Sequence, residues 1–218
     1  MNKILVIAAH PDDELLGCGG TIAKHALSGD EVYTLIVCEG ESLRYQGQNI
    51  DQSVYIKKSG DILGVKKNFH LRFPDQRLDT FSLVDIITPI EKVVRELKPN
   101  IIYLQYGGDI NRDHKIVFEA SLVALRPIET YIEEIYAYYT VGSSEWGYPR
   151  LFNPDTWIDI SSTIEVKLNA FAEYISELKA YPHPRSLRSL KNLSTYTGNQ
   201  VFMEYAESFM TIRKTKRG

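Results

Sequence analysis

Cysteine is scarce in this chain, with only Cys18 and Cys38 among its 218 residues. The two are not spaced like the paired cysteine ligands of a structural zinc site. A chain of this length buries enough surface to fold without disulfides or a structural metal. This cysteine usage is typical of a protein from a reducing compartment.

Long apolar runs are equally scarce. The apolar run that follows Lys3 contains about six residues before it meets His10, Pro11 and a group of acidic residues. Such a run is too short for the core of a signal peptide or for a membrane span. We therefore expect a cytoplasmic soluble protein that does not contact a membrane.

An excess of basic residues is also missing. The chain has 25 Lys and Arg residues against 28 Asp and Glu residues, which gives a net charge of −3. A protein that binds a nucleic-acid backbone normally carries a basic stripe, so we do not expect nucleic acid as a partner. Apolar residues make up 44% of the chain and charged residues 24%, and these proportions exclude a disordered or coiled-coil chain.

Continuous apolar runs predict three strands that are buried on both faces, at Lys3–Ala9, Glu31–Cys38 and Asn100–Gln105. Helical segments lie between them, and this alternation implies βαβ units and a parallel sheet. We expect an α/β, Rossmann-like fold with a mostly parallel central sheet and helices on both faces. It would form a single domain over residues 1–218, with a basic tail from about residue 213.

Two helical segments carry boundary signals. Within 83–97, the stretch Thr88-Pro89-Ile90-Glu91 combines a cap residue with Pro at the first helical position, which predicts a break or kink at Pro89. Ser162-Thr163-Ile164-Glu165 has the form of a capping box. It predicts a helix whose apolar face continues to Leu178.

Polar residues follow the first predicted strand at once, in the order His10-Pro11-Asp12-Asp13-Glu14. A parallel sheet places its ligands beyond the carboxyl ends of its strands. His10 and Asp13 can turn toward one point, and imidazole nitrogen with carboxylate oxygen is a zinc-type donor set. Asp12 is left as a second carboxylate that need not bind the ion. Asp and Pro are also ordinary turn formers and helix caps.

A second polar cluster, Gly107 to His114, follows the strand predicted at Asn100–Gln105. His114 could complete a His-Asp-His set with His10 and Asp13. Three protein ligands and an open position are typical of a catalytic zinc site. Asp113, next to His114, is a candidate for a residue that orients a histidine or the substrate. An Asp-His pair can also simply begin a helix, but the two clusters together favour a metal site.

These motifs resemble those of the LmbE-like, or PIG-L, family of zinc-dependent N-deacetylases. Ala9-His10-Pro11-Asp12-Asp13-Glu14 matches the first signature of that family, and Asn111-Arg112-Asp113-His114 matches its second, His-x-Asp-His, except at the first position. The likeness spans most of the chain, since it also covers Gly17, Gly19-Gly20, Pro74-Asp75, His183-Pro184-Arg185-Ser186 and Tyr205-Ala206-Glu207.

The resemblance implies a metal-dependent hydrolase. His10, Asp13 and His114 would bind Zn²⁺, or another divalent transition metal such as Fe²⁺, and Asp12 would be the general base. The expected partner is a small-molecule N-acetylated amino sugar or sugar conjugate, which the reaction would split into acetate and a free amine. Homo-oligomerisation is left open.

Asn111 departs from the family pattern, which often has His at this position. Asn can donate a hydrogen bond to an oxyanion but cannot act as an acid at pH 7. The proton for the leaving amine must then come from Asp12, which would return the one it took, or from His183. A surface-loop position explains His183 equally well.

Two other functions are considered. The first is a metal-binding Rossmann-like protein of the same fold without deacetylase activity, which Asn111 alone supports. The second is a nucleotide-binding Rossmann protein. That protein would need a glycine-rich turn directly after the first strand, where this chain has His10 to Asp13.

Overall fold

The computed structural model describes residues 1–41 and 51–216. Its strands are β1 (Lys3–Ala8), β2 (Glu31–Cys38), β3 (Lys67–Phe73), β4 (Ile101–Gln105), β5 (Glu134–Tyr138), β6 (Thr156–Asp159) and β7 (Ala206–Lys214). Its α-helices are α1 (Asp13–Leu27), α2 (Gln52–Leu63), α3 (Leu83–Leu97), α4 (Arg112–Ala124), α5 (Ile164–Ala172) and α6 (Leu187–Asn199). Two short 3₁₀ helices are η1 (Leu78–Thr80) and η2 (Ser144–Trp146).

The strands form one sheet in the order β3-β2-β1-β4-β5-β7-β6. The pairings from β3 to β5 are parallel, whereas β7 is antiparallel to β5 and to β6. This architecture confirms the predicted α/β fold with a mostly parallel sheet. Within the described ranges, no helix has the length and apolar character needed to cross a membrane.

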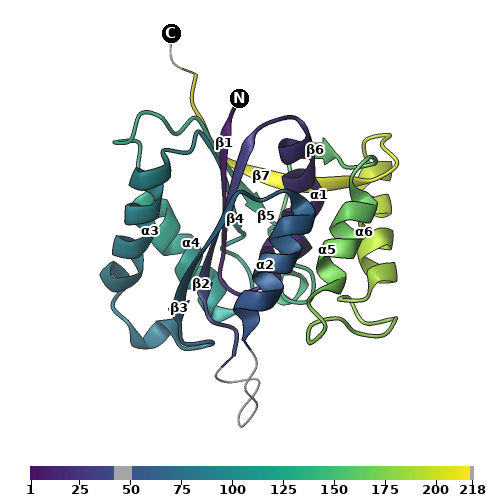
Figure 1. The fold of residues 1–218 in the computed structure, drawn as a ribbon, viewed down its shortest axis with the longest axis horizontal. Helices are drawn as coiled ribbons and strands as arrows, with labels where there is room; N and C mark the ends of the chain where they lie inside the picture. The colour runs from purple at the N-terminus through teal and green to yellow at the C-terminus, as the bar shows by residue number, and fades with distance from the viewer. Residues whose placement is uncertain (42–50, 217–218) are drawn as a thin grey trace.

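Helices cover both faces of the sheet, with α3 and α4 on one side and α1, α2, α5 and α6 on the other (Figure 1). The alternation of side chains along β1 separates the two cores. Ile4, Val6 and Ala8 pack into the core beneath α1, α2 and α5. Leu5 and Ile7 pack into the core beneath α3 and α4. Because β1 is buried on both faces, its sequence is apolar without a polar alternation.

The order in which the chain adds strands to the sheet reverses between β1 and β4. From β1 the chain continues to β2 on one side, and from β4 it continues to β5 on the other. Ligands of open α/β sheets bind at such a point, outside the carboxyl ends of the strands. His10 follows β1 and His114 lies just after β4, so the topology brings the two polar clusters to the same crevice.

Helix α1 contains a break that the sequence did not predict. Cys18 has φ −144° and ψ 25°, which divides the helix into two segments. The break follows Gly17, where an added Cβ would lie 2.0 Å from the ring of Tyr138. Gly17 therefore lets α1 approach the last residue of β5 closely.

Of the break or kink predicted at Pro89, the break is wrong, because α3 runs continuously from Leu83 to Leu97; the kink stays a prediction. Proline removes one intrahelical hydrogen bond. The apolar face that includes Ile86, Ile90 and Val94 is nevertheless fully buried on both sides of Pro89. Burial of that face against the sheet stabilises the helix more than one missing bond destabilises it.

The C-terminal elements differ from the prediction in two ways. Helix α5 has Thr163 instead of Ser162 at its N-cap position, with no capping hydrogen bond from its side chain, and ends at Ala172, well before Leu178. The chain turns there because Tyr174 is buried and its hydroxyl donates to Glu14 Oε1 at 3.0 Å. Strand β7 continues to Lys214, so the first two residues of the expected basic tail lie in the sheet.

Candidate metal centre and active site

Three side chains converge at the carboxyl ends of β1 and β4, and we call His10, Asp13 and His114 the His-Asp-His triad. His10 Nδ1 lies 3.2 Å from His114 Nε2. Asp13 Oδ2 lies 3.3 Å from each of these two nitrogens. All three residues are buried, with at most 4% of their surface exposed.

The Asp13 carboxylate is held in place by neutral donors as well as by the histidines. Its Oδ2 accepts hydrogen bonds from the His10 backbone N–H at 2.9 Å and from Gln105 Nε2 at 2.8 Å. Burial alone would raise the pKa of Asp13, but the charge of His114 and hydrogen bonds from both histidines keep that pKa well below its usual range. Asp13 is therefore ionised at neutral pH.

The second nitrogen of His10 faces two carboxylates. Its Nε2 lies 3.1 Å from Asp113 Oδ2 and 3.2 Å from Asp75 Oδ1. Burial would lower the pKa of His10, but Asp113 and Asp13 raise it well above its ordinary value. A carboxylate at Nε2 favours the tautomer with the proton on that nitrogen, which leaves the Nδ1 lone pair directed at the centre of the triad.

His114 is oriented in the same manner by Asp109. His114 Nδ1 lies 3.2 Å from Asp109 Oδ2, and the same oxygen accepts from Ser143 at 2.8 Å and Ser144 at 2.6 Å. Burial lowers the pKa of His114, yet the charge of Asp13 and the contact with Asp109 raise it overall. His114 Nε2 is thus left for the triad.

The spacing of the triad fits a tetrahedral metal ion. An ion with bonds of about 2.0 Å to nitrogen and oxygen holds neighbouring donors about 3.3 Å apart. The three donor atoms have this spacing, and Asp13 Oδ1 is buried with no hydrogen-bond partner among the described residues. The chemistry and geometry of the donor set therefore suit Zn²⁺ or a similar divalent ion.

A second group, His10, Cys38 and Asp113, also places possible ligand atoms near one another. It suits a metal less well. Burial raises the pKa of the Cys38 thiol to about 12, so the thiolate that a metal requires is disfavoured. Both Asp113 oxygens accept backbone N–H groups, from Gln76 at 2.8 Å and from Leu78 at 3.1 Å.

Asp12 lies beside the triad in an unusual backbone conformation. Its φ is +101°, a region that residues other than glycine rarely adopt. Its Oδ2 lies 3.0 Å from Arg185 Nη1, and Arg185 also pairs with Glu177. Strain of this kind is often found at functional sites, where the surrounding structure holds the residue in position.

Asn111 lies at the N-terminus of α4 as its cap residue. Its side-chain oxygen accepts from the Asp113 N–H at 2.9 Å, and its own N–H donates to Asp109 Oδ1 at 2.8 Å. This position links Asn111 to the carboxylate of Asp109 and to the backbone N–H of Asp113, the two residues that orient the histidines. Its role toward an oxyanion stays a prediction.

His183 is exposed and lines a cavity of about 590 Å³ with Trp146, Lys179 and Arg185. Its Nδ1 accepts the Arg185 backbone N–H at 3.0 Å. Because Arg185 contacts Asp12, this cavity adjoins the candidate base. Within residues 1–41 and 51–216, no hydrogen bond or ion pair joins His183 to the triad.

Sequence reasoning missed several polar residues around the triad. Asp109 and Gln105 lie in or just before the second polar cluster, but nothing in their spacing indicated which side chain they would contact. Asp75 and Arg185 belong to stretches that carry the family resemblance. They had no role until the fold placed them beside His10 and Asp12.

Comparison with known proteins agrees with these motifs. Residues 5–125 match the family described as PIG-L, GlcNAc-PI de-N-acetylase. The chain is 29% identical to an uncharacterised deacetylase, YaiS, of Escherichia coli K12, over 82% of this chain and 89% of that protein. It is 28% identical to the diacetylchitobiose deacetylase of Thermococcus kodakarensis, over 95% of this chain and 82% of the relative.

Solved structures share the fold. The conserved protein TT1542 of Thermus thermophilus has a TM-score of 0.80 and 24% identity, and the likeness covers 100% of this chain and 98% of that one. A 4-carboxy-2-hydroxymuconate hydratase, GalB, of Pseudomonas putida KT2440 has a TM-score of 0.76 and 18% identity, with 100% and 99% covered. Proteins with this fold thus catalyse more than one type of reaction, so the function has to be inferred from the residues of the site.

Proposed function

The chain belongs to the PIG-L family of GlcNAc-PI de-N-acetylases, and on that premise we propose that it is a metal-dependent hydrolase of N-acetylated amino sugars or their conjugates. The reaction would cleave the acetamide C–N bond with water and release acetate and a free amine. The diacetylchitobiose deacetylase of Thermococcus kodakarensis and a probable N-acetyl-α-D-glucosaminyl L-malate deacetylase of Bacillus cereus, 27% identical, support this substrate class.

The observation that carries the proposal is the mutual spacing of the triad. Three donor atoms of zinc-binding type lie 3.2–3.3 Å from one another. His10 Nδ1, Asp13 Oδ2 and His114 Nε2 would hold the ion. When bound, such an ion polarises the amide carbonyl and lowers the pKa of water to about 7.

Asp12 is the residue we assign as general base. It adjoins a ligand, and its Oδ2 lies 3.0 Å from Arg185 Nη1, which fixes the position of the carboxylate. Asp12 would accept a proton as water attacks the acetamide carbon. The resulting tetrahedral species collapses only when the leaving nitrogen gains a proton.

Two residues could supply that proton. Asp12 could return the one it accepted. His183 could donate only from its imidazolium form, so the hydrogen bond that its Nδ1 accepts from the Arg185 N–H would first have to open. Its place in the cavity beside Arg185 supports this role, and Asn111 would serve only as a neutral donor or a cap.

Hydration of a substrate is a second candidate function, because the likeness to the fold of the hydratase GalB covers the whole of this chain. A hydratase adds water to a carbon–carbon double bond and releases no acetate. The metal-binding protein without deacetylase activity is the other alternative. Neither alternative would release acetate, so acetate release separates both from the proposed function.

The test is acetate release, followed by proton NMR, from N-acetylglucosamine, N,N′-diacetylchitobiose and N-acetylglucosaminyl malate. The proposed function predicts equal amounts of acetate and primary amine from at least one of them, and loss of both products with a chelator. His183→Ala should lower kcat with little change in KM if His183 is the acid. No acetate from any N-acetyl sugar by metal-loaded protein would contradict the proposal.

A further inference from the structure

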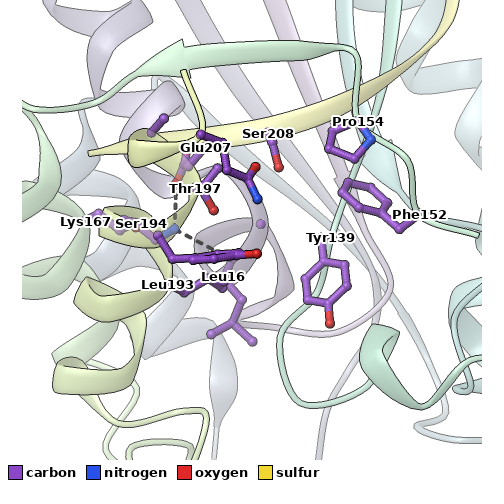
Figure 2. Close-up of a pocket in the computed structure, with 14 residues that line it drawn as sticks. Leu16, Tyr139, Phe152, Pro154, Lys167, Leu193, Ser194, Thr197, Glu207 and Ser208 are labelled. Carbon is purple, nitrogen blue, oxygen red and sulfur yellow. Dashed lines mark hydrogen bonds and ion pairs between the residues drawn. The ribbon is translucent and has the colours of Figure 1, made fainter. Parts of the chain in front are cut away.

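A second cavity lies beside α1, where Leu16 and Gly17 line it, and we propose that it binds a neutral, polyhydroxylated ring of monosaccharide size. Its volume is about 280 Å³, close to the lower limit of about 300 Å³ for small-molecule pockets. Residues from α1, α5, α6 and β7 line it, together with Tyr139, Phe152 and Pro154 (Figure 2).

Two residues that are mostly buried turn hydroxyl groups without a protein partner toward this cavity. Ser194 and Thr197 are 3% and 9% exposed, and they lie three positions apart on one face of α6. Neither hydroxyl makes a hydrogen bond to any described residue. Neither oxygen is among the fully buried polar atoms that lack a partner, so both hydroxyl groups open onto the cavity and are available to a molecule in it.

The floor of the cavity is a buried ion pair between Lys167 and Glu207, with 2.6 Å between Nζ and Oε1. Lys167 also donates to Leu16 O at 3.2 Å, which accounts for two of its three protons. Glu207 accepts from the backbone N–H groups of Gly20 and Thr21. The pair therefore spans the break in α1 and is fixed before any ligand arrives.

An aromatic wall faces the polar floor. Figure 2 shows Tyr139, Phe152 and Pro154 on one side of the cavity and Lys167, Thr197 and Glu207 on the other. The rings of Tyr139 and Phe152 lie 5.2 Å apart between centroids. The two rings are tilted by 59°, so each offers its own apolar surface opposite the hydrogen-bonding groups. Such an arrangement suits a sugar ring, whose C–H face packs on an aromatic residue while its hydroxyl groups bond to polar partners.

Charge selects the class of ligand. Lys167 and Glu207 are the charged residues that line the cavity, and their charges cancel. A phosphate or carboxylate group would meet Glu207 as readily as Lys167 and would gain no net attraction. A neutral ligand with hydroxyl groups meets donors and acceptors without this penalty.

The cavity is distinct from the candidate active site. None of its lining residues is a member of the triad, and neither Asp12 nor Arg185 lines it. The fully buried ring of Tyr138 packs against Gly17, behind the cavity wall. The inference does not rest on the proposed deacetylation, because its ligand needs no acetamide.

The experiment measures binding of methyl β-glucopyranoside to the full chain by saturation-transfer NMR, since this sugar has no acetamide to hydrolyse. Ser194→Ala/Thr197→Val removes both free hydroxyl groups, and Phe152→Leu removes one of the two aromatic rings of the wall but keeps most of the volume. Each should weaken binding about tenfold. Thr195→Val is the matched control, because the Thr195 hydroxyl bonds to Lys191 O instead.

The expected result is binding that both cavity variants weaken, that Thr195→Val and Asp12→Asn leave within about twofold, and that inorganic phosphate does not displace. Binding that the cavity variants leave unchanged would overturn the proposal, as would absence of binding to the unmodified chain. Loss in Asp12→Asn alone would place the sugar in the active site and overturn it too. Displacement by phosphate would contradict the neutral ligand.

Discussion

His10 Nδ1 and His114 Nε2 lie 3.2 Å apart, although 104 positions separate the two residues in the chain. The parallel pairing of β1 with β4 produces this contact, because it brings the carboxyl ends of both strands to one crevice. Asp13 Oδ2 completes the group at 3.3 Å from each nitrogen. The predictions below follow from this geometry and from the residues packed around it.

Asp109 should strengthen metal binding through His114. Asp109→Asn removes the carboxylate charge 3.2 Å from His114 Nδ1 but keeps an oxygen that Ser143 and Ser144 can contact. Loss of such a partner typically lowers metal affinity about 10–100-fold. Competition with a chromophoric chelator measures the change, with exposed Asp85→Asn as the control. Equal affinity in the two variants would show that Asp109 does not act on the metal.

Asp12 should be needed for turnover and dispensable for metal binding. Asp12→Asn keeps the size of the side chain, and Asn tolerates the positive φ of this position better than most residues. Loss of general base catalysis should lower kcat about 10²–10⁴-fold. Metal content is measured in parallel by atomic emission. A variant with normal metal content and near-normal kcat would remove Asp12 from the mechanism.

Glu14 should make the stability of the metal-free protein fall as pH rises. Burial raises the pKa of Glu14 to about 8, and the nearby charges of Asp12 and Asp13 add to the rise. From about pH 4.5, the unfolded carboxyl loses its proton while the folded one keeps it until about pH 8, so unfolding becomes easier across this window.

Glu14→Gln has no carboxyl group to titrate at this position. The free energy of unfolding of the variant, relative to that of the unmodified protein, should therefore increase between pH 5 and pH 8. The gain should be on the order of a few kcal/mol. Urea denaturation of chelator-treated protein at several pH values measures it. A difference that is independent of pH would refute the raised pKa.

The Lys167–Glu207 pair should matter for stability. Both side chains are 4% exposed, so Lys167→Met leaves a carboxylate buried without its counter-charge. This should lower the free energy of unfolding by about 3–5 kcal/mol. Lys167→Met/Glu207→Gln should regain part of the loss, because Gln can still accept from Gly20 and Thr21. Equal stability of the single and double variants in urea would contradict this account.

Much of the fold was predictable because the central strands are buried on both faces. That burial makes Lys3–Ala8 and Glu31–Cys38 continuous apolar runs, which are easily recognised. The convergence of the triad was predictable for a related reason, since His10 and Asp13 come soon after β1 and His114 lies in the polar cluster that follows β4. The packing of helices against the sheet was harder to predict from the sequence. The buried face of α3 overrides the signal of Pro89, and burial of Tyr174 ends α5 early.

The residues around the triad could not be found from spacing. Asp75 reaches His10 from the loop after β3, and Arg185 reaches Asp12 from the segment before α6. These contacts depend on how loops of irregular backbone cross the edge of the sheet, and no period in the sequence encodes them. The break in α1 at Cys18 likewise follows from long-range contacts, with Tyr138 and with Glu207.

The central claim is that His10, Asp13 and His114 bind one divalent metal ion that the reaction requires. Metal content per chain, measured beside acetate release while zinc is titrated into chelator-treated protein, tests this claim most directly. We predict that acetate release rises with zinc and reaches its plateau at one equivalent, and that His114→Ala shows neither the bound ion nor the activity. Full activity in protein that holds no metal, or an unchanged metal content in His114→Ala, would contradict the account.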